Sequence, residues 1–207
     1  MAPMHEILPG VHHWTAMRES IGALVSSYYV EAAGILIDPM LPQEGLDAFA
    51  GLQRPQQVVL TSGLHARDAG AFADAFGCVI RAPREAASRL QGRLDMQPYS
   101  HGDELAPAVT GLEIGRLAPD EYALHLQIAG GAIVFADALN HYGDTLGFFP
   151  DYLLGDDPAA VKRALTRAFE GLLAEREFDH LLFAHGDPIV GGGKAALRAF
   201  VKQQGEP

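Results

Sequence analysis

The chain has 207 residues, of which 48% are hydrophobic and 20% are charged, and its formal net charge is −11. These values are typical of one globular domain and exclude a disordered or fibrous chain. The excess of acid argues against nucleic acid and against a membrane surface as partners, because both need a basic face on the protein. A single cysteine, Cys78, excludes an internal disulfide and a cysteine-cluster metal site.

The N-terminus and the hydropathy pattern favour a soluble protein of the cytoplasm. The chain begins Met1-Ala2-Pro3-Met4-His5, without the basic and then apolar run of a secretory signal. Apolar stretches stay well short of the ~18 residues that a transmembrane helix needs. The sequence contains no repeat, low-complexity tract or linker, so residues 1–207 are predicted to form a single domain.

In the first half of the chain, predicted strands alternate with predicted helices. Strands over 23–31 and 34–38 are joined by a turn at Ala32-Ala33-Gly34, which favours a hairpin. The elements expected after this hairpin are a helix over 43–52, a strand over 58–60, a helix over 66–76, a strand over 78–80 and a helix beginning at Pro83. Strands separated by helices predict parallel pairing with the helices outside.

The second half predicts three strands in close succession, over 111–117, 122–129 and 132–136. Asp156-Asp157-Pro158 is a strong helix start, because proline suits the first turn and acidic side chains suit the positive end of the helix dipole. This helix is expected to run to about Glu175, with an apolar stripe at Val161, Leu165, Phe169 and Leu172 or Leu173. A last strand over 180–184 and a helix ending near Val201 complete the chain.

Four segments, taken in chain order, resemble a known fold. They are SSYYV (26–30) followed by GILID (34–38), VVLT (58–61), IVFADAL (133–139) and FAHGDP (183–188). The set resembles the metallo-β-lactamase fold, an α/β fold in which two mixed sheets form a four-layer αββα sandwich. The resemblance implies that Asp38 supports a metal site from behind, that Asp137 is the metal-bridging aspartate and that His185 is the last histidine ligand.

The resemblance also implies a His-x-His-x-Asp-His motif that holds two ions, usually zinc, with a nucleophilic hydroxide between them. Aligning the leading threonine of this motif on Thr61 places Ser62, Leu64, Ala66 and Arg67 at the four ligand positions. None of these is a histidine or an aspartate, and the charge of Arg67 repels a cation. The family's middle histidine has no counterpart, since the segment 117–122 offers only carboxylates. We therefore expect the fold to persist with a degenerate metal site and no cofactor.

Arg67 offers one explanation of how the charge of Asp137 is balanced without an ion. A carboxylate left buried and unpaired is costly, and a guanidinium at the vacated position is able to pair with it in a forked geometry. We therefore predict an Arg67–Asp137 ion pair.

A mononuclear metal site is the alternative. If the loop after Thr61 shifts by one residue, His65 and Asp68 join Asp137 and His185 as ligands. Two histidines and two carboxylates suit a single zinc, iron or manganese ion. The competing interpretation is that His65 is a loop residue and that Asp68 stabilises the start of a helix.

Two further features concern ligands and partners. His141 and Tyr142 follow Asp137 on a glycine-containing loop, where this fold would place a pocket wall, although a polar surface loop explains them equally well. The aromatic residues at 148, 149 and 152 indicate either a contact surface, and with it a homo-oligomer, or the roof of a pocket.

Three functional hypotheses follow, and the sequence leaves open whether the protein is an enzyme. The favoured one is a hydrolase-like protein that binds a small molecule or a partner without a working two-ion site. The second is a mononuclear metal-dependent hydrolase of an ester, thioester or lactone. The third is metal-free catalysis in which His185 is the general base and Asp137 orients it, which needs hydrogen-bond contact between the two.

Overall fold

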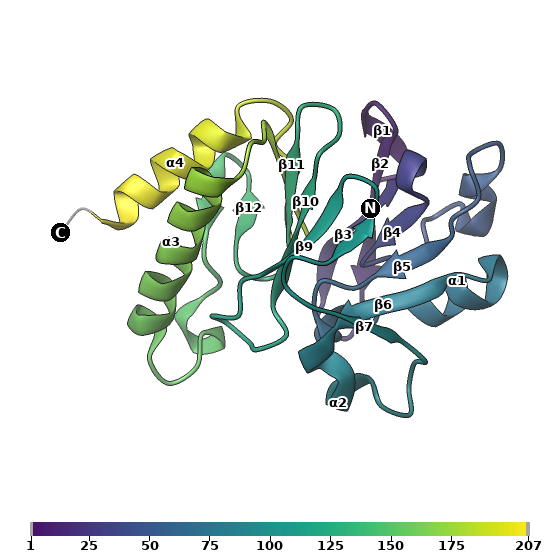
Figure 1. The fold of residues 1–207 in the computed structure, drawn as a ribbon, viewed down its shortest axis with the longest axis horizontal. Coiled ribbons are helices and arrows are strands. Elements are labelled where there is room, and N and C mark those ends of the chain that lie inside the picture. Colours follow the sequence, from purple (N-terminus) through teal and green to yellow (C-terminus); the bar gives the residue numbers. More distant parts are fainter. Residues whose placement is uncertain (1, 206–207) are drawn as a thin grey trace.

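The structure is a computed structural model that describes residues 2–205. Two mixed β-sheets pack face to face, with helices on both outer faces (Figure 1). The N-terminal half of the chain forms one sheet with its helices, and the C-terminal half forms the other. This arrangement confirms the predicted α/β class and the four-layer αββα sandwich.

The first sheet has seven strands in chain order. They are β1 (His5–Leu8), β2 (Val11–Arg18), β3 (Ala23–Val30), β4 (Ile35–Ile37), β5 (Gln57–Val59), β6 (Val79–Pro83) and β7 (Gln97–Tyr99). Strands β1 to β4 pair antiparallel, and β4 to β7 pair parallel. The hairpin predicted between 23–31 and 34–38 is present as β3 and β4, and Gly34 makes its left-handed turn with φ 63°.

The second sheet has five strands in the order β14-β11-β10-β9-β8. Their bounds are β8 (Glu104–Ala106), β9 (Val109–Glu113), β10 (Tyr122–Leu126), β11 (Ala132–Phe135) and β14 (His180–Phe183). Only the β11–β14 pair is parallel. A separate two-stranded ribbon is formed by β12 (Asn140–Tyr142) and β13 (Thr145–Gly147).

Four α-helices cover the sheets in the described part of the chain, namely α1 (Ala69–Phe76), α2 (Ala87–Leu90), α3 (Pro158–Glu175) and α4 (Gly193–Gln204). Short 3-10 helices lie at η1 (Glu31–Ala33), η2 (Gly45–Phe49), η3 (Gly63–His65), η4 (Arg84–Ala86) and η5 (Asp151–Leu153). The helix predicted from Asp157 is confirmed, and the Asp157 side chain accepts a hydrogen bond from the Ala160 amide, 2.9 Å away.

Several predicted elements have different bounds in the structure. The helix expected over 43–52 is only the short η2, and the one expected at Pro83 begins as η4, because Pro83 itself ends β6. Helix α1 starts at Ala69, three residues later than predicted, since η3 and the loop after it precede the helix. Strands β1 and β2, which pair antiparallel, were not predicted.

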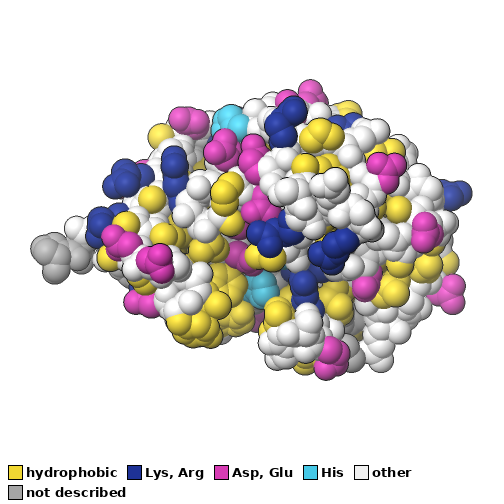
Figure 2. Space-filling model, turned by 90° about the horizontal axis from the view of Figure 1, so that it is seen from below, with side chains coloured by type: hydrophobic (Ala, Val, Ile, Leu, Met, Phe, Trp, Pro, Cys, Tyr) yellow, Lys and Arg dark blue, Asp and Glu magenta, His cyan; other side chains and the backbone are white. Residues whose placement is uncertain are grey.

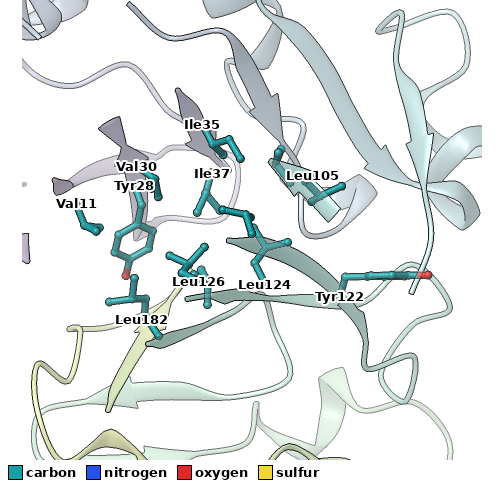
Figure 3. Close-up of a cluster of buried hydrophobic side chains, with 14 of the residues drawn as sticks. Val11, Tyr28, Val30, Ile35, Ile37, Leu105, Tyr122, Leu124, Leu126 and Leu182 are labelled. Atoms are coloured by element: carbon teal, nitrogen blue, oxygen red, sulfur yellow. The ribbon is translucent and has the colours of Figure 1, made fainter. Parts of the chain in front are cut away.

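The central core lies between the two sheets (Figure 3). Side chains of the first sheet, such as Tyr28 and Ile37, point toward Leu124, Leu126 and Leu182 of the second sheet. Two further clusters lie under the helices, one beneath α3 and α4 and one beneath α1 and η2. Burial of apolar surface on both faces of each sheet is what holds the four layers together.

No helix among residues 2–205 combines the length and apolarity that crossing a bilayer requires.

His13 on β2 generates a prediction about acid stability. Burial, and then the charge of His5, lower the pKa of His13 to about 4. The unfolded chain binds a proton at this residue near pH 6.5, whereas the folded chain binds it only near pH 4. The free energy of unfolding therefore decreases by about 3 kcal/mol as the pH falls from 6.5 to about 4. Above pH 6.5 this residue causes no such loss.

We expect His13→Gln to reduce this acid loss, because glutamine does not titrate. The measurement is the free energy of unfolding in urea at several pH values between 7 and 4, for the wild type and the variant. Parallel pH profiles for the two proteins would contradict the prediction.

Candidate functional site

The candidate site lies where four loops leave the carboxyl ends of parallel strands. Asp38 follows β4, and His65 lies in the loop after β5, its parallel neighbour in the first sheet. In the second sheet, Asp137 follows β11 and His185 follows its parallel neighbour β14. Because the carboxyl ends of parallel strands meet at one edge, the chain brings these four side chains together from positions 38 to 185.

The four side chains form a continuous chain of contacts. His65 Nδ1 lies 2.8 Å from Asp38 Oδ2, and His65 Nε2 lies 3.2 Å from Asp137 Oδ1. The same oxygen of Asp137 is 3.2 Å from His185 Nε2. Asp38, His65 and His185 are buried, and Asp137 is the most accessible of the four.

Both ring nitrogens of His65 face carboxylate oxygens, which only accept hydrogen bonds when ionised. This geometry suits the doubly protonated imidazolium. Burial acts to lower the pKa of His65, but the charges of Asp137 and Asp38 outweigh it and raise that pKa to about 9. His65 is therefore a buried cation between two carboxylates.

The two carboxylates are correspondingly held in their charged form. Burial favours neutral Asp38, yet the charge and hydrogen bond of His65 keep its pKa below the usual value. Burial likewise opposes the charge of Asp137, and His65 and His185 again lower its pKa. Thr61 also hydrogen-bonds to Asp38 through its amide, at 2.8 Å, and through its hydroxyl.

Glu121 is a buried carboxyl group that the sequence analysis did not identify as a site residue. Its Oε1 accepts hydrogen bonds from the amides of Asp137, at 2.8 Å, and Ala138, at 2.7 Å. Burial and the nearby charge of Asp137 raise the pKa of Glu121 well above its usual value, which favours the neutral form of the group. Glu121 positions the backbone at Asp137. Two acidic residues directly before the buried strand β10 were the available signal for it.

Arg67 does not pair with Asp137 as predicted. Its Nη1 instead donates to the carbonyl oxygens of Ser26, at 2.6 Å, and Asp38, at 2.7 Å. The reason is local, because Arg67 has a left-handed φ of 38° and its side chain reaches back to β3 and β4. Its Nε and Nη2 are buried with no hydrogen-bond partner in the described part of the chain. The guanidinium therefore adds a second buried positive charge near the two aspartates, acting on both without a direct ion pair.

Asp68 is not part of the cluster. Its Oδ2 accepts a hydrogen bond from the Leu41 amide at 2.8 Å, which holds it against the loop after β4. The mononuclear site predicted from His65, Asp68, Asp137 and His185 is therefore wrong in one member. Asp68 occupies the N-cap position of α1, as the competing interpretation expected, but its side chain makes no capping hydrogen bond.

The remaining positions of the aligned motif are used for other contacts. Asp120 Oδ2 accepts the Gly63 amide at 2.9 Å and is 3.5 Å from the Ser62 hydroxyl. Arg89 Nε lies 3.5 Å from the same oxygen, and Arg18 Nη1 donates to the Leu64 carbonyl at 3.0 Å. Arg18 therefore binds η3 directly and Arg89 binds it through Asp120, in the segment aligned with the metal motif. Basic side chains are also grouped near the middle of the face seen in Figure 2, despite the net charge of −11.

A cavity of about 470 Å³ lies next to the cluster. Its lining includes Ser26, whose carbonyl binds Arg67, and Gly186, which follows His185. His141 and Tyr142 also line it, which is where a pocket wall was expected. Gly186 has φ +99°, and a Cβ there would collide with the His141 carbonyl, so only glycine lets the β12 backbone lie against this loop.

The aromatic residues at 148–152 divide between two roles. The Phe148 ring packs on Phe169 of α3, whereas the Phe149 ring meets the His185 ring edge-on at 5.3 Å between centroids. Tyr152 is 82% exposed. Phe149 thus covers one side of the site, and the predicted oligomer contact at Tyr152 stays a prediction.

Three side chains of the site offer ligand atoms for a metal ion. Among the described residues, one group of three, His65, Asp137 and His185, offers ligand atoms within 4.8 Å of one another. Three donors match the number in a catalytic one-zinc site, and Asp38 on His65 Nδ1 resembles the carboxylate that orients a zinc-bound histidine. The four positions aligned with the motif, Ser62, Leu64, Ala66 and Arg67, offer no histidine or aspartate.

No protein-family model and no curated protein sequence matches this chain. Solved structures do match over nearly its whole length. DIM-1 metallo-β-lactamase is 12% identical with a TM-score of 0.70, and the match covers 97% of this chain and 96% of that one. A metallo-β-lactamase from Erythrobacter litoralis is 15% identical with a TM-score of 0.66, covering 97% and 96%.

A mutant flavo di-iron protein from Thermotoga maritima also matches, with 14% identity and a TM-score of 0.67. That match covers 97% of this chain but only 60% of the other, so the shared part is one portion of a larger protein. Together with the strand order and the site loops described above, these matches establish the architecture. The chain has the metallo-β-lactamase fold.

Proposed function

We propose that this protein binds a small molecule in the cavity beside the site and does not act as a two-ion hydrolase. One observation carries the proposal, namely that His65 lies between Asp38 and Asp137 with both ring nitrogens in contact with carboxylate oxygens. In a two-ion hydrolase, metal cations neutralise such acidic groups. Here a side chain supplies the positive charge.

Charge counting supports this proposal. The buried cluster contains two carboxylates, Asp38 and Asp137, and two cations, His65 and Arg67. The raised pKa of Glu121 favours its neutral form, so this group adds little to the negative charge. The cluster is therefore balanced by its own side chains, and buried charges are tolerated when they are paired in this way.

The adjacent cavity supplies the binding function. Its volume of about 470 Å³ lies within the range of ~300–1,000 Å³ that is usual for small-molecule sites. The cluster contacts its wall at two places, because Arg67 binds the Ser26 carbonyl and Gly186 directly follows His185, which contacts Asp137. A wall held in this way costs little to order when a ligand binds.

A one-ion hydrolase is the second candidate, and the three donors His65, Asp137 and His185 favour it. A single zinc, iron or manganese ion bound there would supply an activated water and polarise the carbonyl of an ester, thioester or lactone. In that function Asp38 would keep His65 oriented, and Glu121 would hold the backbone of Asp137. The metal-free alternative meets its geometric condition, since His185 and Asp137 are in contact at 3.2 Å.

The proposal predicts that His65 stabilises the fold as a cation. His65→Ala leaves Asp38 and Asp137 buried without their shared partner, and we expect a loss of about 3 kcal/mol in the free energy of unfolding. The measurement is urea unfolding with a chelator present, which separates this role from metal binding. Adding Asp137→Asn to the variant should recover part of the loss, because one uncompensated charge is removed.

His5→Ala is the matched control for this experiment, because the His5 side chain is exposed and contacts neither carboxylate. We expect it to change the free energy of unfolding by less than ~0.5 kcal/mol. Equal stability of the His65→Ala variant and the wild type would contradict the charge role of His65.

Metal content separates the two candidate functions. We expect protein purified without an affinity tag and dialysed against zinc-free buffer to contain no stoichiometric zinc, iron or manganese in elemental analysis. We also expect no hydrolysis of a chromogenic β-lactam. Two ions per chain would overturn the proposal. One ion per chain that is lost in His185→Ala, with lactone or thioester hydrolysis that depends on it, would establish the one-ion hydrolase instead.

A further inference from the structure

The cavity beside the charge cluster is unusual in its histidines. His5, His13 and His141 all line it, together with Tyr142 and Asp187. No lysine or arginine is among its described lining residues. Which atoms of these side chains donate and which accept hydrogen bonds indicates the chemical class of the ligand. This inference rests on the small-molecule binding proposed above.

Two of the histidines are fixed by backbone carbonyls. His5 Nδ1 lies 3.0 Å from the Pro3 oxygen, and His141 Nδ1 lies 2.8 Å from the Asp187 backbone oxygen. A carbonyl oxygen only accepts, so each Nδ1 carries the hydrogen. In the neutral ring, Nε2 is then left as a hydrogen-bond acceptor.

His13 is fixed in the opposite tautomer. Its Nε2 lies 3.0 Å from Ser26 Oγ, and that hydroxyl donates to the Gly186 oxygen at 3.2 Å. Since the hydroxyl hydrogen is used, His13 Nε2 must donate, and Nδ1 is the acceptor. Among the described residues no group hydrogen-bonds to this Nδ1. Burial is the main cause that lowers the pKa of His13 to about 4, so this ring stays neutral.

The other lining groups add negative charge and an aromatic face. The side-chain carboxylate of Asp187 makes no hydrogen bond or ion pair within the described part of the chain, and its charge acts on His13. Tyr142 is 56% exposed and is one of the residues that line the cavity. Thr15 Oγ1 is already an acceptor, for the Ala2 amide at 2.7 Å.

We propose that this cavity binds a small organic ammonium ion that carries an apolar or aromatic group. Its N–H groups would donate to the free nitrogens of the histidines and to Asp187, and its charge would lie near the Tyr142 ring. An anion would meet acceptor atoms and a carboxylate without a compensating cation. A metal ion held between the histidines of this cavity is disfavoured. Among the described residues, the ligand atoms that lie within 4.8 Å of one another belong to His65, Asp137 and His185, which do not line the cavity.

Three probes of equal size and different charge test the ligand class: benzylamine, benzyl alcohol and benzoate. We expect benzylamine to raise the melting temperature in a saturable way and benzoate to leave it unchanged. In isothermal titration, Asp187→Asn should weaken benzylamine binding at least tenfold, because the carboxylate is lost while the shape is kept. Asp144→Asn is the matched control, since Asp144 carries the same charge on the neighbouring turn but does not line this cavity.

The tautomers provide a readout that needs no ligand. Long-range ¹H–¹⁵N spectra of the imidazole rings at pH 8 should show hydrogen on Nδ1 of His5 and His141, and on Nε2 of His13. Addition of benzylamine should shift the nonprotonated nitrogen of each ring while the tautomers remain.

The outcomes separate this inference from the proposed function. If benzoate or benzyl alcohol binds better than benzylamine, and Tyr142→Ala removes that binding, the ammonium class is wrong and small-molecule binding stands. If none of the three probes binds, and the spectra show other tautomers, the acceptor-lined cavity is refuted. If benzylamine binds equally well to Asp187→Asn and to the wild type, the ammonium site lies elsewhere.

Discussion

The contact of His65 with two carboxylates is the interaction on which the site depends. Asp38 and Asp137 belong to different sheets, and both are withdrawn from water by the sandwich that encloses them. Carboxylates in such a place need a positive partner, whether a metal ion or a side chain. His65 provides it from η3, and in doing so ties the edges of the two sheets together.

This pairing also explains the roles of the residues around it. Arg67 turns back to the carbonyls of Ser26 and Asp38, so its charge supports the cluster while its hydrogen bonds hold β3 and the loop after β4. Glu121 holds the amides of Asp137 and Ala138. The same contacts hold the cavity wall, since the Ser26 carbonyl binds Arg67 and Gly186 follows the Asp137-bound His185.

Local signals in the sequence predicted some features well and others poorly. The helix from Pro158 to Glu175 was predicted with its observed bounds, because its start signal and apolar stripe are both strong and local. The Arg67–Asp137 pair and the place of Asp68 were predicted wrongly. The first error came from placing Arg67 at a ligand position of the metal motif, and the second from shifting that motif by one residue. Arg67 has a left-handed φ, and its side chain donates to the carbonyls of Ser26 and Asp38 instead.

The sequence by itself determined the alternation of strands and helices in the first half of the chain, and its resemblance to a known family implied the two-sheet sandwich, the missing ligands at 62, 64, 66 and 67, and the candidacy of Asp137 and His185. The alternation follows from periodicity and turn signals, which are properties of short segments, whereas the resemblance rests on four segments in chain order. Only the tertiary structure decided that His65 lies between Asp38 and Asp137, and that His5, His13 and His141 share one cavity. Contacts between residues so far apart in the chain depend on strand register and sheet packing, and a single sequence does not reveal either of them.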